Sequence, residues 1–249
     1  MQKAFCFKGE KEYSFNIPDE NDKVFETIKW GKFEEFFTPA YWLAQTWFFE
    51  LTEDPSLNYK LGGTFIEEVV ACLLGGYGIP SEVGSAKFHQ FKQSNILSRK
   101  DINLHDIEQI MFFPIIINGK ERNYRFAKQK SKYIYDALNK LIYINEEKYS
   151  DIELRNMLLS INGIGLKTAS WIVRNYRNSD NVAILDIHLY RAGVLAGFYS
   201  KNDKVEKHYF EMERKFVNFC KNIGIQTSKL DAVIWRTMKE LNTYALSKI

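Results

Sequence analysis

The sequence predicts a mostly α-helical protein with a small β-hairpin at its N-terminus. Beyond about residue 30, apolar residues recur at helical spacing through most of the chain. Residues 1–30 alternate apolar and polar side chains in places instead, which is typical of strands. The breaks between periodic segments are short, and no long-period repeat or low-complexity linker separates them. With 249 residues, 45% of them hydrophobic, the chain can bury one substantial core or two subdomains that share an interface.

The individual elements follow from these patterns and from capping signals. Two alternating runs, Ala4–Phe7 and Tyr13–Ile17, flank a plausible turn at Lys8–Lys11 and predict the hairpin. The glycine-rich segment Gly75–Pro80 is a strong helix stop. Pro39 is expected to break or begin the first helix. About ten helices are expected, over residues 33–51, 64–74, 81–91, 104–112, 125–142, 150–160, 166–175, 186–196, 205–220 and 229–246.

Composition narrows the class of protein. A net charge of +3 permits nucleic-acid binding through a local patch but does not argue for it. Aromatic residues make up 15%, which suits either a bulky core or stacking surfaces, with a core as the default. The three cysteines are scattered, without the spacing of a disulfide framework or zinc site. No signal peptide or membrane span is expected, which predicts a cytoplasmic (nucleoid-associated) or nuclear protein that is not secreted.

The most informative segment is the Gly-x-Gly turn, Gly163-Ile164-Gly165, between two predicted helices. Glycines adopt backbone angles that other residues resist, and they allow another backbone to approach closely. The amides that open the following helix point outward, where the helix dipole adds positive potential, so a phosphate fits there. A glycine-containing turn without a functional role is the alternative.

Residues 154–197 resemble the helix-hairpin-helix DNA glycosylases, which excise damaged bases. The match consists of the leucine-rich end of a helix, the Gly-x-Gly turn, Lys167 two residues later, and Asp186 19 residues after that lysine. Asp186 follows the apolar run Val182–Leu185 and opens a helix. Asn162 departs from the family pattern, which usually has proline at that position.

The resemblance implies a two-lobed helical fold. Residues 1–60 would pack with the C-terminal helices, 61–180 would form a central lobe ending in the helix-hairpin-helix, and 181–249 would complete the second lobe. It also implies that Gly163, Ile164, Gly165 and Thr168 contact the DNA backbone.

Lys167 stands where family members with lyase activity carry their nucleophile. A neutral amine there would attack C1′ of the sugar, expel the base and leave a Schiff base that permits strand cleavage. Desolvation or a nearby cation would have to favour the neutral amine. A lysine that only contacts phosphate is the alternative.

Asp186 would stabilise positive charge at C1′ and help to deprotonate the attacking group. It could also cap the helix that it precedes, and the two roles are compatible. His188, two residues later, could reach a phosphate or simply lie on the helix surface.

Other candidate contacts are less specific. Trp171 lies one helical turn after Lys167 and is either a wall of the base pocket or part of the core. Tyr77, in the glycine-rich loop, is either a wedge for the gap left by the base or a structural residue. The basic segment after Gly119 could follow a phosphate backbone on one helical face or be a solvated face; its residues are Lys120, Arg122, Arg125, Lys128, Lys130 and Lys132, with Tyr124, Phe126, Tyr133 and Tyr135 interleaved. Residues that read the base edge are expected from Phe33–Trp47 and Trp235–Tyr244.

No cofactor is expected. Some relatives carry four C-terminal cysteines for an iron–sulfur cluster, but Cys220 is the one cysteine after residue 72, so no such cluster can form. Some family members bind a monovalent cation through turn carbonyls, here those of Ile161 and Ile164.

The leading hypothesis is a monomeric DNA glycosylase/AP lyase that removes an oxidised purine, best 8-oxoguanine, from double-stranded DNA. One alternative is a noncatalytic protein that uses the Gly-x-Gly turn only to hold DNA. Others are a glycosylase for another modified base, in defence for example, and a monofunctional enzyme in which Asp186 activates water.

Overall fold

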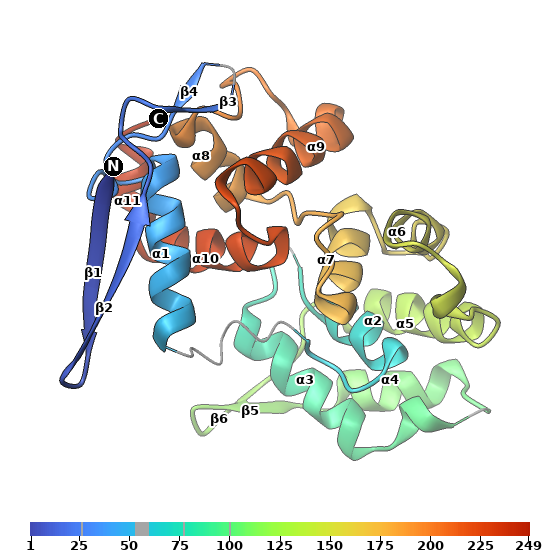
Figure 1. Cartoon of the computed structure of the whole chain (residues 1–249). Coiled ribbons are helices and arrows are strands. Elements are labelled where there is room, and N and C mark those ends of the chain that lie inside the picture. The colour runs from blue at the N-terminus through green and yellow to red at the C-terminus, as the bar shows by residue number, and fades with distance from the viewer. Residues whose placement is uncertain (26, 53–59, 77, 100) are drawn as a thin grey trace. The chain divides into compact units, whose positions relative to one another are not determined.

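The structure is a computed structural model and describes residues 1–25, 27–52, 60–76, 78–99 and 101–249. Within these residues it contains eleven α-helices and three two-stranded antiparallel sheets (Figure 1). The predicted fold class is therefore confirmed.

The chain divides into two compact units. Met1–Tyr59 and Asn178–Ile249 form one, here the discontinuous unit, and Lys60–Arg177 form the other, the continuous unit. The domain boundaries that the sequence suggested, after residues 60 and 180, stay predictions.

The discontinuous unit joins both ends of the chain. Its elements are β1 (Gln2–Lys8), β2 (Lys11–Ile17), β3 (Lys23–Phe25), β4 (Ile28–Lys29), α1 (Pro39–Thr52), α8 (Ile187–Ala196), α9 (Val205–Ile223), α10 (Thr227–Glu240) and α11 (Asn242–Leu246). The predicted hairpin is confirmed, with β1 paired to β2 from Gln2↔Ile17 to Lys8↔Lys11. Helix α10 packs against α1, α8 and α9 (Figure 1).

Aromatic side chains fill much of the core of the discontinuous unit. Trp42, Phe216 and Phe219 are fully buried, and the rings of Phe198 and Phe219 stack with centroids 4.3 Å apart. The default expectation that aromatic residues build the core is correct for these residues.

The ends of two helices in the discontinuous unit differ from the periodic segments expected. Of the segment from residue 33, the helix begins at Pro39, which confirms the expectation for this proline, because proline fits the first turn, where its missing N–H is not needed. The helix expected over residues 229–246 is interrupted at Leu241, where α10 ends and α11 follows.

The continuous unit carries the Gly-x-Gly turn. Its elements are α2 (Phe65–Leu74), α3 (Ser81–Gln93), α4 (Leu104–Phe112), β5 (Ile115–Ile117), β6 (Lys120–Arg122), α5 (Ala127–Leu141), α6 (Asp151–Leu158) and α7 (Leu166–Arg177), with 3-10 helices at Ile96–Ser98 and Glu146–Lys148. Helix α2 packs against α3, α5 and α7, and α6 packs against α7.

A buried carboxylate fixes α7 to the start of α2. Glu68 is fully buried; its Oε2 accepts hydrogen bonds from the amides of Leu61 and Gly62 at 2.7 and 2.8 Å, and its Oε1 accepts from Asn175 Nδ2 at 2.9 Å. Burial raises the pKa of the Glu68 carboxyl above its ordinary value, against the opposing effect of these bonds. The helix that follows the turn is thus held in a specified place on the continuous unit.

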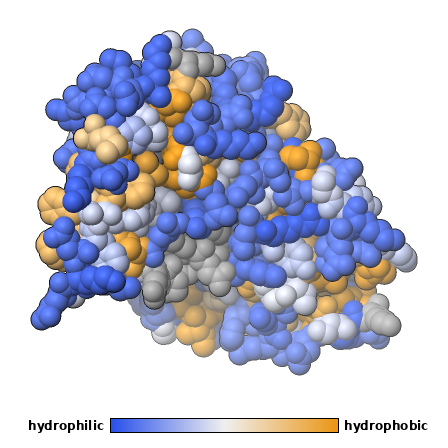
Figure 2. All heavy atoms as spheres, viewed as in Figure 1, coloured by the Kyte–Doolittle hydropathy of each residue, from blue (hydrophilic) through white to orange (hydrophobic). Residues whose placement is uncertain are grey.

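Hydrophilic residues cover most of the face shown in Figure 2, and hydrophobic residues form scattered patches on it. No helix in the described part of the chain is long and apolar enough to cross a bilayer.

Candidate active site

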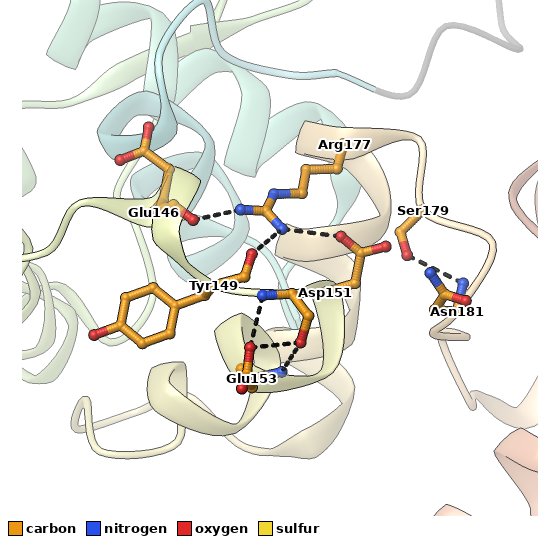
Figure 3. Close-up of polar contacts among 8 residues, drawn as sticks. Glu146, Tyr149, Asp151, Glu153, Arg177, Ser179 and Asn181 are labelled. Atoms are coloured by element: carbon orange, nitrogen blue, oxygen red, sulfur yellow. Dashed lines mark hydrogen bonds and ion pairs between the residues drawn. The ribbon is translucent and has the colours of Figure 1, made fainter.

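Helices α6 and α7 pack together as a hairpin, and one arginine joins their ends on the side away from the turn. Arg177, the last residue of α7, donates from its guanidinium to the carbonyl oxygens of Tyr149 (2.8 Å) and Glu146, and to Asp151 Oδ1 (3.0 Å) (Figure 3). A capping box at the start of α6 adds reciprocal bonds between Ser150 and Glu153. The ends of α6 and α7 distant from the turn are therefore fixed.

The two glycines of the turn have different surroundings. Gly163 has a φ of +85°, and a Cβ placed on it would lie 2.3 Å from Cδ2 of Tyr133. A Cβ on Gly165 would meet nothing within 4 Å. Gly163 is therefore required by the fold of the turn, whereas the space beside Gly165 is open to an approaching molecule.

The turn presents the N-terminus of α7 to that open space. The amide of Ala169 donates to the carbonyl of Gly165 at 2.9 Å and makes the first hydrogen bond of the helix. The amides of Leu166, Lys167 and Thr168 precede this bond and point out of the helix end. This is the arrangement in which a helix N-terminus binds a phosphate.

Lys167 is the second residue of α7 and its side chain is exposed. Thr168, beside it, is half-buried. Position and exposure leave the Lys167 amine available to a ligand that sits at the N-terminus of α7.

Trp171 occupies an intermediate environment. It is half-buried, and a Cβ placed on Gly75 would come within 2.8 Å of its ring. Trp171 therefore packs against Gly75, at the start of the glycine-rich loop after α2. It is neither fully in the core nor free of packing, so its proposed role as a pocket wall stays a prediction.

Asp186 belongs to the discontinuous unit, where it caps α8. Its Oδ1 accepts from the amides of His188 and Leu189 at 2.8 and 2.9 Å, so the predicted capping role is confirmed. Among the described residues Oδ2 has no hydrogen-bond partner. His188 is half-buried, and its amide is committed to this cap.

The apolar run before Asp186 belongs to none of the helices or strands in the described part of the chain. The amide of Ala183 donates to Glu213 Oε1 at 3.1 Å, and that of Ile184 donates to Asp231 Oδ2 at 3.3 Å. The hydroxyl of Tyr209 donates to the carbonyl of Ala183 at 2.9 Å. Side chains of α9 and α10 thus satisfy this buried backbone and fix the position of Asp186.

The basic segment after Gly119 is not one helical face, so that expectation was wrong. Lys120 and Arg122 lie on β6, because the turn at Gly119 (φ +72°) folds the chain into a short hairpin. Lys130 points inward and donates to the carbonyls of Leu73 and Gly75.

Other members of the segment differ in their exposure. Tyr124 is buried and donates to the carbonyl of Leu74 at 2.6 Å, so it is not a stacking surface. Arg125 and Lys128 are exposed, and the Arg125 guanidinium lies 4.7 Å from the centroid of the Phe126 ring. Arg125 and Lys128 stay candidates for contacts with a phosphate backbone.

Three other interpretations of the sequence stay predictions. Tyr77 lies outside the described residues, so its wedge role stays a prediction. The carbonyl of Ile161 accepts from the amide of Ile164 at 3.1 Å, and the predicted cation site there stays a prediction. The two segments expected to read the base line one cavity of about 440 Å³ in the discontinuous unit, together with Phe48 and Phe49. Their residues in it are Phe33, Glu34, Phe36, Tyr41, Gln45, Thr237, Glu240 and Leu241.

Sequence reasoning named Tyr133 only as an aromatic residue of the basic segment, and it missed the contacts that α5 makes with the turn and the residues before it. The Tyr133 ring packs on Gly163, the carboxylate of Asp136 accepts from the amide of Asn162, and Lys140 donates to the carbonyl of Ser160. Their spacing places them on one helical face, but nothing in the sequence pairs that face with the turn.

Comparisons with known proteins agree with this fold and hairpin. The family model described as 8-oxoguanine DNA glycosylase matches residues 82–225. A curated 8-oxoguanine DNA glycosylase/AP lyase of Metallosphaera sedula is 33% identical over 122 residues, which cover 47% of this chain and 59% of that protein. The chain spans less than two thirds of the length of the curated relatives it matches first.

Solved structures show the same fold at low identity. The 8-oxoguanine DNA glycosylase of Thermotoga maritima superposes with a TM-score of 0.59 at 19% identity, covering 81% of this chain and 97% of that one. The 8-oxoguanine glycosylase/lyase of Methanocaldococcus jannaschii, crystallised with a 15mer DNA containing 8-oxoguanine, gives 0.56 at 20% identity, covering 80% and 90%. Because the family model covers more than half of the sequence, the chain belongs to the 8-oxoguanine DNA glycosylase family of the helix-hairpin-helix superfamily.

Proposed function

We propose that this protein is a bifunctional DNA glycosylase/AP lyase that acts on double-stranded DNA carrying an oxidised purine, with 8-oxoguanine as the preferred base. The observation that carries the proposal is the exposed Lys167 at the N-terminus of α7, directly after a turn whose second glycine faces open space. Membership of the family and the names of the curated relatives support the choice of substrate.

In the proposed reaction the open side of the turn receives a phosphate of the damaged strand. The amides at the start of α7 donate to the phosphate oxygens, and this contact orients the sugar toward Lys167. The amine nitrogen bonds to C1′ while the bond from C1′ to the base breaks. The base leaves with that electron pair and takes up a proton.

The lyase step follows from the same covalent bond. The nitrogen loses a proton and forms a second bond to C1′ while the C1′–O4′ bond breaks. O4′ takes up a proton, and an imine then joins Lys167 to C1′ of the open sugar. Removal of a proton from C2′ then expels the 3′ phosphate by β-elimination. Oδ2 of Asp186, which the cap leaves unused, is proposed to stabilise the positive charge that develops at C1′.

Borohydride trapping tests this proposal, because it reduces the imine to a stable amine and leaves the protein attached to DNA. A duplex with one 8-oxoguanine should give an adduct with the wild type and none with Lys167→Gln. Lys221→Gln, which removes an exposed lysine of α9, is the matched control and should trap normally. If neither 8-oxoguanine nor any other lesion gives an adduct or releases a base, the enzymatic proposal fails.

A panel of duplexes separates the alternatives. Each duplex carries one lesion opposite one of the four bases, and base release and strand nicking are measured separately. A bifunctional enzyme releases the base and nicks the strand, whereas a monofunctional enzyme releases the base alone. A noncatalytic protein binds the duplexes without either product. Preference for a modified base other than 8-oxoguanine would redirect the substrate assignment and leave the mechanism in place.

A further inference from the structure

One face of α5 holds the first glycine of the Gly-x-Gly turn and the segment that leads into it. Tyr133, Asp136 and Lys140 follow one another at intervals of three and four residues, so they project from the same side of the helix. Tyr133 contacts Gly163 in the turn, and Asp136 and Lys140 contact Asn162 and Ser160 just before it. We call these three residues the α5 clamp.

The polar part of the clamp is a bridged carboxylate. Oδ2 of Asp136 accepts from the amide of Asn162 at 2.9 Å and from Nζ of Lys140 at 3.0 Å. The same Nζ donates to the carbonyl of Ser160 at 2.7 Å. The clamp therefore satisfies one donor and one acceptor of the turn just before Gly163.

The charge of Asp136 is coupled to these contacts. Burial by itself raises the pKa of the carboxyl, but the bonds from Asn162 and Lys140 outweigh it, so the pKa lies below the ordinary value. The contacts at Asn162 and Lys140 stabilise the ionised form of Asp136. By linkage, ionised Asp136 also holds this segment more firmly than protonated Asp136 does.

A carboxylate at this place is unfavourable for DNA binding on charge alone. A negative charge close to a bound phosphate backbone repels it, so its removal should strengthen binding. The contacts of Asp136 predict the opposite effect on binding, because the carboxylate helps to support the backbone just before the turn.

On the proposed function, we propose that Asp136 is a positioning residue: with Lys140 it fixes the backbone at Ser160–Asn162 so that the amides of α7 keep the shape that binds phosphate. Tyr133 completes the support by filling the space beside Gly163. None of the three touches the reacting atoms in the reaction proposed for Lys167.

The test compares Asp136→Asn with Glu121→Gln, which removes one negative charge from an exposed position on β6. Affinity for an undamaged duplex is measured by fluorescence anisotropy. We expect Asp136→Asn to weaken binding about tenfold, the effect of about one charged hydrogen bond, and Glu121→Gln to leave it equal or tighter. Equal or tighter binding by Asp136→Asn would overturn the proposal.

Kinetics separate positioning from chemistry. For Asp136→Asn, the DNA concentration that gives half-maximal trapping should rise by the same factor of about ten, while the single-turnover rate at saturating DNA stays within about twofold. A fall in the saturated rate with unchanged half-saturation would contradict a positioning role.

The partner amide provides a second route if Asp136→Asn alters folding. Asn162→Pro removes the N–H that Asp136 accepts and leaves the carboxylate in place. In the Asn162→Pro background, Asp136→Asn should reduce the free energy of duplex binding by less than half as much as it does in the wild type. An undiminished effect would show that Asp136 does not act through this amide.

The outcomes for the wild type keep the two proposals apart. A wild type that neither binds nor is trapped on any duplex contradicts the proposed function. A wild type that binds and is trapped, with an Asp136→Asn variant that binds equally well, contradicts the clamp alone.

Discussion

Asp186 caps α8 and is also proposed to take part in the chemistry, and single substitutions can separate these roles. One carboxylate oxygen accepts the capping hydrogen bonds. The other is proposed to stabilise the charge that develops at C1′. Asparagine caps helices about as well as aspartate, whereas alanine does not cap.

We therefore expect Asp186→Asn to keep the stability of the wild type and to lose most of its trapping activity, by about a hundredfold. Asp186→Ala should lose as much activity and also about 1 kcal/mol of stability. Urea unfolding and single-turnover trapping measure the two effects. Near-normal trapping by Asp186→Asn would remove this residue from the chemistry.

The two glycines of the turn form a second matched pair. Gly163→Ala meets both a left-handed backbone and the Tyr133 ring, so we expect a loss of about 2–4 kcal/mol in the free energy of unfolding. Gly165→Ala enters open space and should change stability by no more than about 0.5 kcal/mol. If a DNA backbone approaches there, Gly165→Ala should still weaken duplex binding about tenfold, measured by anisotropy.

The role of a residue is easier to predict from the sequence when its partners lie close to it in the chain. The cap at Asp186 is formed by amides two and three residues away, so the sequence contains both partners. Lys130 instead caps the C-terminus of α2 from more than fifty residues away, and its place in a basic run gave no sign of this.

At the level of elements, one buried lysine joins α3 to α4. Nζ of Lys87 on α3 donates to the carbonyls of Ile110 and Phe113 at 2.9 and 2.6 Å, and to Gln90 Oε1 at 2.7 Å. These carbonyls lie at the end of α4, where no helical amide remains to satisfy them. Lys87→Met should therefore cost about 2–4 kcal/mol, measured by urea unfolding.

The same lysine predicts a pH dependence. Burial lowers the pKa of Lys87 to about 8, whereas the ordinary value is 10.5. Between these values the unfolded chain binds more protons than the folded chain, so this residue makes the free energy of unfolding rise with pH across that window. The rise from pH 8 to 10 should be smaller in Lys87→Met than in the wild type. Identical pH slopes in the two proteins would show that Lys87 is not responsible.

The positions of the helices were largely predictable because apolar periodicity and caps are local. Thr64 and Ser150 both cap helices that were expected to begin there. The short strands β3 to β6 were not predicted, since strands of two or three residues show no alternation. The clamp was missed for a related reason: it joins two segments that are each ordinary on their own.

At the level of the whole molecule, the proposed catalytic pair is divided between the two units. Lys167 belongs to the continuous unit and Asp186 to the discontinuous one. The resemblance predicted both residues from their spacing, while the residues that read the base stay a prediction. Base reading depends on the shape of a surface, and periodicity carries no information on that shape.

Mixing two inactive variants tests whether one chain supplies the whole site. If the protein is a monomer, Lys167→Gln mixed with Asp186→Asn should show no trapping above either variant alone. Light scattering of the wild type should give a mass near 29.3 kDa. Recovery of activity in the mixture would mean that two chains exchange parts to complete the site.

The unlike surroundings of Gly163 and Gly165 also have a genetic consequence. In a library scored only for folded protein, position 163 would accept almost nothing but glycine, while position 165 would accept other residues as well. On the proposed function, a screen for survival under oxidative DNA damage would accept glycine alone at both positions. Comparing the two screens at each codon would separate the requirements of folding from the requirements of binding the proposed substrate.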